Sequence, residues 1–513
     1  MSRSRIPNRR LVAVLAAGAV VTTLLSGCVS WFFPPQPSTT STPTGEQVDA
    51  ALQPFYSQVL VWRGCGGGLQ CTTAEAPMNW DDPAQDTIEL ALVRQPATGQ
   101  RLGSLLVNPG GPGASGYDFV VDSIDFATSE RLQQSYDIVG FDPRGVGHST
   151  AVSCGPPSFL DEYNYGIIPG EFGSDAWIQA NRDFGAEFGA ACLENTGPLL
   201  QYVDTISAAR DLDLLRAVLG DEKLNFLGYS YGTFLGATYA DLYPEKTGRL
   251  VLDGALDPAT TDFDVTATQA VGFESALRAY LDDCIGQETC PFESTTESAM
   301  KQIGSLLASL QASPLTGEDG RELGAGTMFI AIILPLYNQD TWRYLDDLFS
   351  EVMGGKTDTA FLLADAYNGR QFDGSYLDNS TEAFVSINCL DYVGDYSTET
   401  LRAQAAELAE LAPVFGPRMS YGVGCAAWPF PATRVREPIT AAGSSDILVV
   451  GTTNDPATPY VWAVALADEL ENGHLITYHG EGHTAYNKSN ACVNDAVDDY
   501  FIEGTVPEAD PDC

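Results

Sequence analysis

The sequence predicts an α/β protein, with a mostly parallel sheet and a large, mainly helical cap inserted between two of its strands. Two observations support this fold class. After residue 45, short apolar runs alternate with helical patterns, which is typical of parallel sheets whose strands are joined by helices. Between residues 252 and 447 the alternation stops, and only helical patterns and loops occur. Such a block is most simply a cap over the carboxyl ends of the strands.

Short apolar runs bounded by turn residues are the predicted core strands. Continuous apolar runs of this length are expected for strands that are buried on both faces. The runs are 88–93, 104–108, 137–141, 224–227, 250–252, 447–451 and 475–478. Residues 205–219 carry apolar side chains at helical spacing, and so do residues 461–470. These two segments are expected to be helices that cover the sheet.

The predicted cap consists of helices joined by loops. The helical patterns cover 273–282, 301–310, 328–337, 341–352 and 401–411. The third of these is apolar almost throughout, but it is too short to span a membrane. We expect it to be a buried helix of the cap.

The amino terminus has the pattern of an export signal. Four arginines precede an apolar run over residues 11–25, which ends in Leu25-Ser26-Gly27-Cys28. This ending resembles the bacterial lipobox, in which the cysteine is acylated. We therefore expect a signal peptide over 1–27, a lipidated Cys28 and a Pro/Ser/Thr tether through residue 45. The protein would then be exported and anchored by lipid to the outer face of the cell membrane or released, by either the general or the twin-arginine route.

The composition excludes several classes of protein. The chain of 513 residues has 68 Asp and Glu against 26 Lys and Arg, a formal net charge of −42. Nucleic acid binding needs clustered basic residues, so nucleic acid is not an expected partner. Only four histidines are present, which leaves little room for a zinc site, and no metal is expected.

The cysteines indicate an oxidising compartment. Apart from Cys28, ten remain, an even number in a chain that we expect to be exported. They fall into close sequence pairs, which we predict to be five disulfides: Cys65/Cys71, Cys154/Cys192, Cys284/Cys290, Cys389/Cys425 and Cys492/Cys513.

The most informative motif is Gly-Tyr-Ser-Tyr-Gly at residues 228–232. It follows the predicted strand 224–227 and begins a helical stretch over 233–243. Gly-x-Ser-x-Gly between a strand and a helix is typical of a nucleophile elbow, in which glycines allow close strand–helix packing around a strained serine. We therefore predict that Ser230 is a catalytic nucleophile.

A serine nucleophile needs a base, and the base needs an acid to orient it. In hydrolases with this elbow the chain order is serine, acid, histidine. His483 lies in a glycine-rich loop after the last predicted strand and is the preferred base, with His479 as the alternative. Asp455, in the loop after strand 447–451, is the preferred acid. Asp253 and Asp257 remain alternatives, because the loop after the preceding strand can also carry the acid.

The predicted oxyanion hole consists of two backbone N–H groups. Tyr231, directly after the nucleophile, supplies the first. The second is expected from the loop Asn-Pro-Gly-Gly-Pro-Gly at 108–113, where glycines allow the backbone to approach the substrate. Gly111 is the preferred residue, and Gly110 is the alternative. This chemistry needs no cofactor.

Six motifs together resemble one enzyme family, and they cover nearly all of the chain after the tether. They are NPGGPG at 108–113, FDPRGVGHS at 141–149, LGYSYGT at 227–233, INCLD at 387–391, DPATPY at 455–460 and GEGHT at 480–484. The chain is similar to the α/β-hydrolases of the tripeptidyl aminopeptidase family, within the prolyl-aminopeptidase-like class of actinobacterial secreted enzymes. The resemblance implies Ser230, Asp455 and His483 as the triad, in agreement with the residue-by-residue argument.

The resemblance also implies how the chain is divided. In the α/β-hydrolase fold the cap lies between the sixth and seventh core strands, which gives a first core part over 46–258, a cap over 259–435 and a second core part over 436–513. The wider class has a histidine where Pro109 stands here, so the tripeptidyl subgroup fits better than the single-residue prolyl enzymes.

The expected function is an exported serine exopeptidase that releases tripeptides from free N-termini. Asp391, in the INCLD motif, is a candidate for binding the substrate amine, although a structural role in the cap is the stronger interpretation. A carboxylesterase or lipase-type hydrolase of the cell envelope would use the same triad, so the partner is a peptide or an ester. A non-catalytic binding lipoprotein is the third hypothesis.

Overall fold

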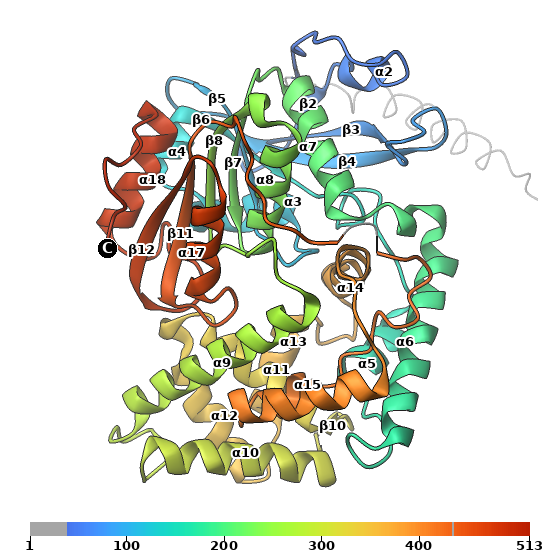
Figure 1. Cartoon of the computed structure of the whole chain (residues 1–513), viewed down its shortest axis with the longest axis vertical. Coiled ribbons are helices and arrows are strands. Elements are labelled where there is room, and N and C mark those ends of the chain that lie inside the picture. The colour runs from blue at the N-terminus through green and yellow to red at the C-terminus, as the bar shows by residue number, and fades with distance from the viewer. Residues whose placement is uncertain (1–37, 433–434) are drawn as a thin grey trace, which may run out of the picture.

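A computed structural model describes residues 38–432 and 435–513. Its centre is a ten-stranded sheet with the order β1-β2-β3-β4-β6-β5-β7-β8-β11-β12. Neighbours from β1 to β6 run antiparallel, and neighbours from β6 to β12 run parallel. The predicted fold class is confirmed: this is the α/β-hydrolase fold (Figure 1).

The strands include all seven that the sequence predicts, together with three at the amino-terminal edge that it does not. Their bounds are β1 Thr39–Thr40, β2 Val61–Gly66, β3 Leu69–Pro77, β4 Thr87–Gln95, β5 Gly103–Asn108, β6 Tyr136–Phe141, β7 Leu224–Tyr229, β8 Thr247–Asp253, β11 Ile447–Asn454 and β12 Gly473–Glu481.

Helices cover both faces of the sheet, because side chains of the central strands alternate between two hydrophobic clusters. Phe226 and Leu250 point to one face, and Leu227 and Val251 point to the other. The first face is covered by α7 Thr205–Leu219, α8 Tyr231–Leu242 and α17 Tyr460–Glu469, and the second by α3 Gly116–Ala127, α4 Glu130–Ser135 and α18 Ala491–Glu503. A short α2, Gln53–Tyr56, lies before β2.

The cap lies between β8 and β11 and has its own hydrophobic core (Figure 1). It contains a small hairpin and eight helices among the described residues: α9 Asp262–Cys284, α10 Thr296–Ala312, β9 Leu315–Thr316, β10 Glu322–Leu323, α11 Ala325–Leu336, α12 Arg343–Met353, α13 Asp358–Asn368, α14 Ser380–Asp391, α15 Thr398–Leu411 and α16 Gly416–Met419. The apolar segment at 328–337 lies in α11 up to Leu336, with Tyr337 as the C-cap, and Met328, Ala331 and Ile332 are fully buried.

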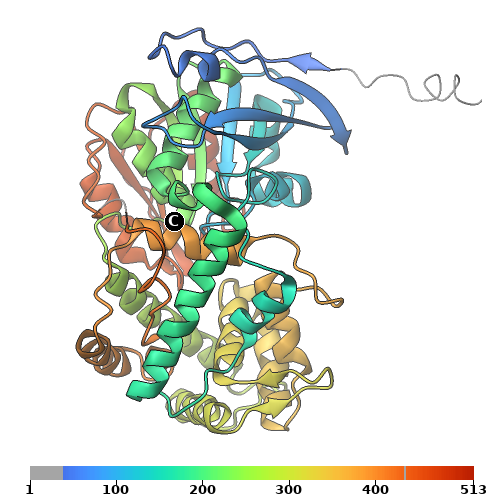
Figure 2. The same ribbon diagram turned by 90° about the vertical axis from the view of Figure 1, so that its right-hand side faces the viewer.

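Two helices that precede β7 also pack on the cap, which the sequence analysis did not foresee. They are α5 Pro157–Tyr165 and α6 Asp175–Thr196. Tyr165 belongs to the hydrophobic core of the cap, and Trp177 and Ile178 pack with Leu401 and Val423. Figure 2 shows α6 running from the sheet to the far end of the cap. The cap is therefore assembled from two separate parts of the chain.

Residues 38–45 differ from the expected tether. Thr39 and Thr40 pair with β2, and the backbone N–H of Thr44 donates to Ala217 O at 2.9 Å. Packing here covers the exposed edge of β2, whose backbone groups need partners. The predicted signal peptide 1–27 and Cys28 lie outside the described residues. Among the helices that the structure describes, none combines the length and apolar character needed to cross a membrane.

The ten remaining cysteines form five disulfides in the pairing that their sequence positions suggest. The bonds are Cys65–Cys71, Cys154–Cys192, Cys284–Cys290, Cys389–Cys425 and Cys492–Cys513. The fourth bond connects α14 to the segment after α16, so it lies entirely within the cap.

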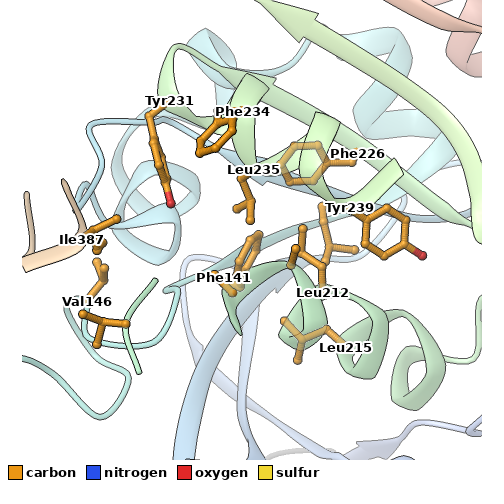
Figure 3. Close-up of a cluster of buried hydrophobic side chains, with 14 of the residues drawn as sticks. Phe141, Val146, Leu212, Leu215, Phe226, Tyr231, Phe234, Leu235, Tyr239 and Ile387 are labelled. Atoms are coloured by element: carbon orange, nitrogen blue, oxygen red, sulfur yellow. The ribbon is translucent and has the colours of Figure 1, made fainter. Parts of the chain in front are cut away.

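A hydrophobic cluster lies beneath the turn after β7 (Figure 3). Phe226 of β7 packs with Leu212 and Leu215 of α7, and with Leu235 of α8. Ile387 of α14 reaches the same cluster next to Tyr231. The helix that follows the nucleophile is thus fixed from both the sheet side and the cap side.

The conspicuous arginine of the FDPRGVGHS motif has a structural role. Arg144 is fully buried, and its Nε and Nη2 donate to the two oxygens of Asp211 at 2.7 Å. Its remaining donors bind the carbonyl oxygens of Pro77, Met78 and Tyr202. All five N–H donors of the guanidinium are therefore used to join β3, α7 and the loop after β6.

We expect the substitution Arg144→Met to lower the free energy of unfolding by about 3–5 kcal/mol, because it leaves the buried Asp211 carboxylate without a counter-charge. Urea denaturation of the disulfide-intact protein measures this. Arg210→Met is the matched control, because Arg210 forms an exposed ion pair with Asp81 at 3.0 Å, and such pairs contribute about 0–1 kcal/mol. Equal losses for the two variants would contradict the interpretation.

Candidate active site

Ser230 lies in the sharp turn between β7 and α8. Its backbone has φ 55° and ψ −124°, a conformation that non-glycine residues rarely adopt. The flanking glycines make this turn possible: a Cβ on Gly228 would lie 2.4 Å from Gly232 O. The N–H of Ser230 donates to Asp253 O at 2.9 Å. The turn therefore has the strained geometry of a nucleophile elbow, with the serine partly exposed.

His483 lies in the loop after β12, and its Nδ1 contacts Asp455 Oδ2 at 2.9 Å. Asp455 also accepts hydrogen bonds from the backbone N–H groups of Ala457, Thr458 and Thr484 at 2.9–3.1 Å. Burial would raise the pKa of Asp455, but the neighbouring His483 and these hydrogen bonds lower it below its ordinary value. The carboxylate thus stays ionised and orients the imidazole.

Ser230 and His483 both adjoin the carboxyl end of β8. Asp253 O accepts the Ser230 N–H, and a Cβ on the next residue, Gly254, would lie 3.2 Å from His483 Cε1. Within the described residues the Ser230 hydroxyl forms no hydrogen bond. Catalytic hydrogen bonds are often long in free enzymes and tighten when substrate binds. The arrangement is therefore suited to a serine nucleophile with a histidine base.

The two alternative acids have other contacts. Asp253 is fully buried and accepts hydrogen bonds from the backbone N–H groups of Ala485 and Tyr486 at 2.8–3.0 Å. Burial raises its pKa to about 6. Asp257 binds the N–H of Ala259 within its own turn. Only Asp455, of the three predicted candidates, contacts the His483 ring.

The other three histidines pair with aspartates away from this site. His148 contacts Asp118, His474 contacts Asp446 and His479 contacts Asp512, and each pair is partly or largely exposed. His479, the alternative base, is 60% exposed at its side chain. Among the described residues no group of three or more His, Cys, Asp or Glu side chains could hold a metal ion.

The loop at 108–113 lies directly against the nucleophile. A Cβ on Gly110 would be 2.8 Å from Ser230 Cβ and 3.0 Å from Tyr231 N. The N–H of Gly110 already donates to Asn108 Oδ1 at 3.0 Å. The N–H of Gly111 has no acceptor among the described residues, and Tyr231 begins a helix, where backbone N–H groups lack intrahelical acceptors. Tyr231 and Gly111 thus offer the two donors that an oxyanion needs.

Asp391, at the end of α14, joins the cap to the start of α7. Its carboxylate accepts hydrogen bonds from Thr205 N at 3.0 Å and Thr205 Oγ1 at 2.6 Å, and Thr205 Oγ1 also contacts Tyr231 OH. Burial raises the pKa of Asp391 to about 7. Because both oxygens are occupied, the geometry favours the structural role over binding of a substrate amine.

The cap contacts both halves of the site. Tyr337, at the end of α11, accepts a hydrogen bond from His483 N at 2.8 Å, and its ring packs edge-on against the imidazole at 5.4 Å. On the other side, a Cβ on Gly113 would lie 2.8 Å from Ser380 O at the start of α14. The cap thus limits the space around Ser230.

Two positioning residues escaped the sequence analysis. Thr458 Oγ1 lies 2.9 Å from Asp455 Oδ2 and 3.1 Å from His483 Nδ1, so it braces that pair. Asp142 accepts hydrogen bonds from Ser115 Oγ, Tyr117 N and His148 N, and so fixes the turn that follows the oxyanion loop. Thr458 lies in the DPATPY motif and Asp142 lies in the FDPRGVGHS motif. The motifs therefore pointed to both residues, but they did not show which groups these residues contact.

The fold and the site together define a serine hydrolase of the α/β-hydrolase class. Residues 412–513 match a family model described as TAP-like protein. The chain is 34% identical to serine protease Hip1 of Mycobacterium tuberculosis, covering 98% of each chain, and 35% identical to carboxylesterase B of the same organism, covering 96% of each. It is 30% identical to a tripeptidyl aminopeptidase of Streptomyces lividans, covering 100% of this chain and 98% of the relative. The protein belongs to the tripeptidyl aminopeptidase family of α/β-hydrolases.

Proposed function

We propose that this protein is an exported serine exopeptidase that removes short peptides, namely tripeptides, from free N-termini. In this mechanism Ser230 Oγ attacks the carbonyl carbon while His483 Nε2 accepts its proton. Asp455 stabilises the imidazolium that forms. The N–H groups of Tyr231 and Gly111 stabilise the negative charge on the substrate oxygen.

The second half of the reaction reuses the same groups. The leaving amine takes the proton from His483, which leaves an acyl-enzyme on Ser230. His483 then accepts a proton from water, and the resulting hydroxide equivalent attacks the ester. The acyl–oxygen bond then breaks while His483 returns its proton to Ser230 Oγ, which releases the acid and regenerates the serine without a cofactor.

The contact of the cap with both catalytic loops carries this proposal. Tyr337 lies against His483, and α14 lies against the oxyanion loop at Gly113. Because the cap lies against both loops, we expect the approach to Ser230 to favour a chain end over a long polypeptide that lies across the site. The net charge of −42 further favours cationic N-termini as they approach.

A carboxylesterase is the second candidate, because the triad is suited equally to esters. The similarity to carboxylesterase B is as high as that to the peptidases. Side chains of the cap would then bind an acyl chain instead of a peptide.

A comparison of three substrates separates the candidates. We expect a free-amine tripeptidyl amide to be hydrolysed with a kcat/KM at least about 100-fold above that of its N-acetylated form. Acetylation removes the charged α-amine that an exopeptidase of this kind must recognise. A simple acyl ester is the third substrate, and Ser230→Ala is the background control. Equal cleavage of the free and acetylated peptides, with faster ester hydrolysis, would favour the esterase and overturn the exopeptidase.

We also propose export and anchoring through Cys28. Five disulfides support an oxidising compartment, since such bonds rarely persist in a reducing cytosol. With Cys28→Ser the protein should move from the membrane fraction to the soluble fraction of expressing cells. An unchanged distribution of the variant would contradict the anchor.

A further inference from the structure

A cavity lies within the cap, at the end of α11 opposite the catalytic loop. Its volume is about 170 Å³. It is lined by the connection between α5 and α6, the end of α10, the start of α11 and residues 418–420. Tyr337, which binds His483 N, lies at the other end of α11, and a helix of twelve residues is about 18 Å long. This cavity is therefore separate from the catalytic site.

Arg418 lines the cavity and has no acidic partner among the described residues. Its Nη1 donates to Gln311 Oε1 at 2.7 Å, and its guanidinium lies 4.3 Å from the centre of the Phe172 ring. Among the described residues two arginines, Arg144 and Arg216, are fully buried, and both bind carboxylates. Burial lowers the pKa of Arg418, and no carboxylate opposes that effect. In a chain with 68 acidic residues, a partly buried arginine without an acidic partner indicates a place for an external anion.

The start of α11 adds backbone donors to the same cavity. The residue before the helix is Gly324, which has no side chain to cap it, so the N–H groups of Ala325, Gly326 and Thr327 lack a side-chain acceptor. All three residues line the cavity. A Cβ on Gly326 would meet nothing within 4 Å, so the space in front of it is open. The amino terminus of a helix of this length attracts anions through its dipole and its free N–H groups.

Trp177 of α6 forms part of the cavity wall and is only 9% exposed. Its Nε1 is buried without an acceptor within the described part of the chain, as are the indole nitrogens of Trp62, Trp342 and Trp428, so this N–H does not mark the ligand. The donors at the cavity are those of Arg418 and the start of α11. The missing group is therefore an acceptor.

The side chains that line the cavity indicate which body the ligand carries besides its anionic group. Phe172, Trp177 and Phe329 give the cavity an aromatic lining. An apolar cavity of about 150 Å³ accepts a benzene ring, so this cavity has room for one ring with a small polar group. A hydrophilic anion such as phosphate would leave these aromatic surfaces unused.

We propose that this cavity binds a small aromatic or branched monocarboxylate, with its carboxylate between Arg418 and the start of α11 and its apolar body against Phe172, Trp177 and Phe329. The carboxylate oxygens accept the donors that are otherwise unused, and the ring fills the aromatic part. The ligand site does not involve Ser230.

Calorimetric titration of the full protein with sodium benzoate tests the proposal, with benzamide as the uncharged analogue. We expect benzoate to bind at least about 10-fold more tightly than benzamide. Arg418→Gln should weaken benzoate binding at least 10-fold, and Trp177→Leu, which removes part of the aromatic wall, should weaken it about 3-fold. Arg343→Gln, an exposed arginine of α12, is the matched control and should leave binding unchanged.

Two further measurements keep the result independent of folding and of the catalytic function. A crystal soaked with 4-bromobenzoate should show the bromine in this cavity, and Ser230→Ala should bind benzoate as tightly as the unmodified protein. Equal affinity for benzoate and benzamide would overturn the proposal. Loss of binding after fluorophosphonate labelling of Ser230 would also overturn it, because it would assign the ligand to the catalytic site.

Discussion

Replacing Ser230 by alanine is expected to lower kcat for a p-nitrophenyl ester by a factor of about 10⁵–10⁶, the scale seen when a triad serine is removed. The hydroxyl is the only group in the strained turn after β7 that can form an acyl-enzyme. Hydrolysis and labelling with a fluorophosphonate probe both measure this, and labelling should disappear. The substitution should leave the fold intact, since no hydrogen bond of the Ser230 side chain occurs within the described residues.

The matched control is Ser305→Ala on α10, whose hydroxyl binds only Lys301 O. It should keep full activity and full labelling. Failure of the unmodified protein to label at Ser230 with the fluorophosphonate probe would revive the hypothesis of a non-catalytic binding lipoprotein. It would also remove the basis of the proposed exopeptidase, whichever substrate was used.

The central strands and the catalytic loops could be predicted because their signals are local. Helix α7 begins and ends where its sequence indicates: Asp204 caps its amino terminus through Ser207 N, and Gly220 ends it in the left-handed conformation. The elbow, the acid loop and the histidine loop each follow an apolar strand. In parallel strands of one sheet the carboxyl ends meet at one edge, so loops far apart in sequence are brought together.

The remaining parts depend on contacts that a local pattern does not contain. Strands β2 and β3 lie toward an edge and carry glycine and polar residues, so their apolar pattern is weak. The apolar residues of α6 show that it packs, but not that Trp177 meets Val423 of the cap. Asp391 is similar: the motif shows a conspicuous carboxylate, and only the fold shows that Thr205 occupies both of its oxygens.

The second large effect is expected from replacing the acid of the triad. The sequence leaves three aspartates as candidates for this role. Asp455→Asn should lower kcat about 10⁴-fold, since an amide favours the wrong imidazole tautomer and cannot stabilise the imidazolium. Asp253→Asn should change kcat by less than about 10-fold, because this side chain positions the backbone of Ala485 and Tyr486 and does not contact the ring.

The order of the two variants should be reversed for stability, with the larger loss for Asp253→Asn. The amide introduced by Asp253→Asn would keep one acceptor oxygen for two buried N–H groups, so we expect this substitution to lower the free energy of unfolding by about 1–3 kcal/mol. Parallel measurement of kcat and urea denaturation for both variants separates the roles. If Asp253→Asn lost activity as severely as Asp455→Asn while remaining folded, the acid would have to be assigned to the loop after β8. The contact of 2.9 Å between Asp455 and His483 argues for the other result, because orienting the base requires a carboxylate at the ring itself.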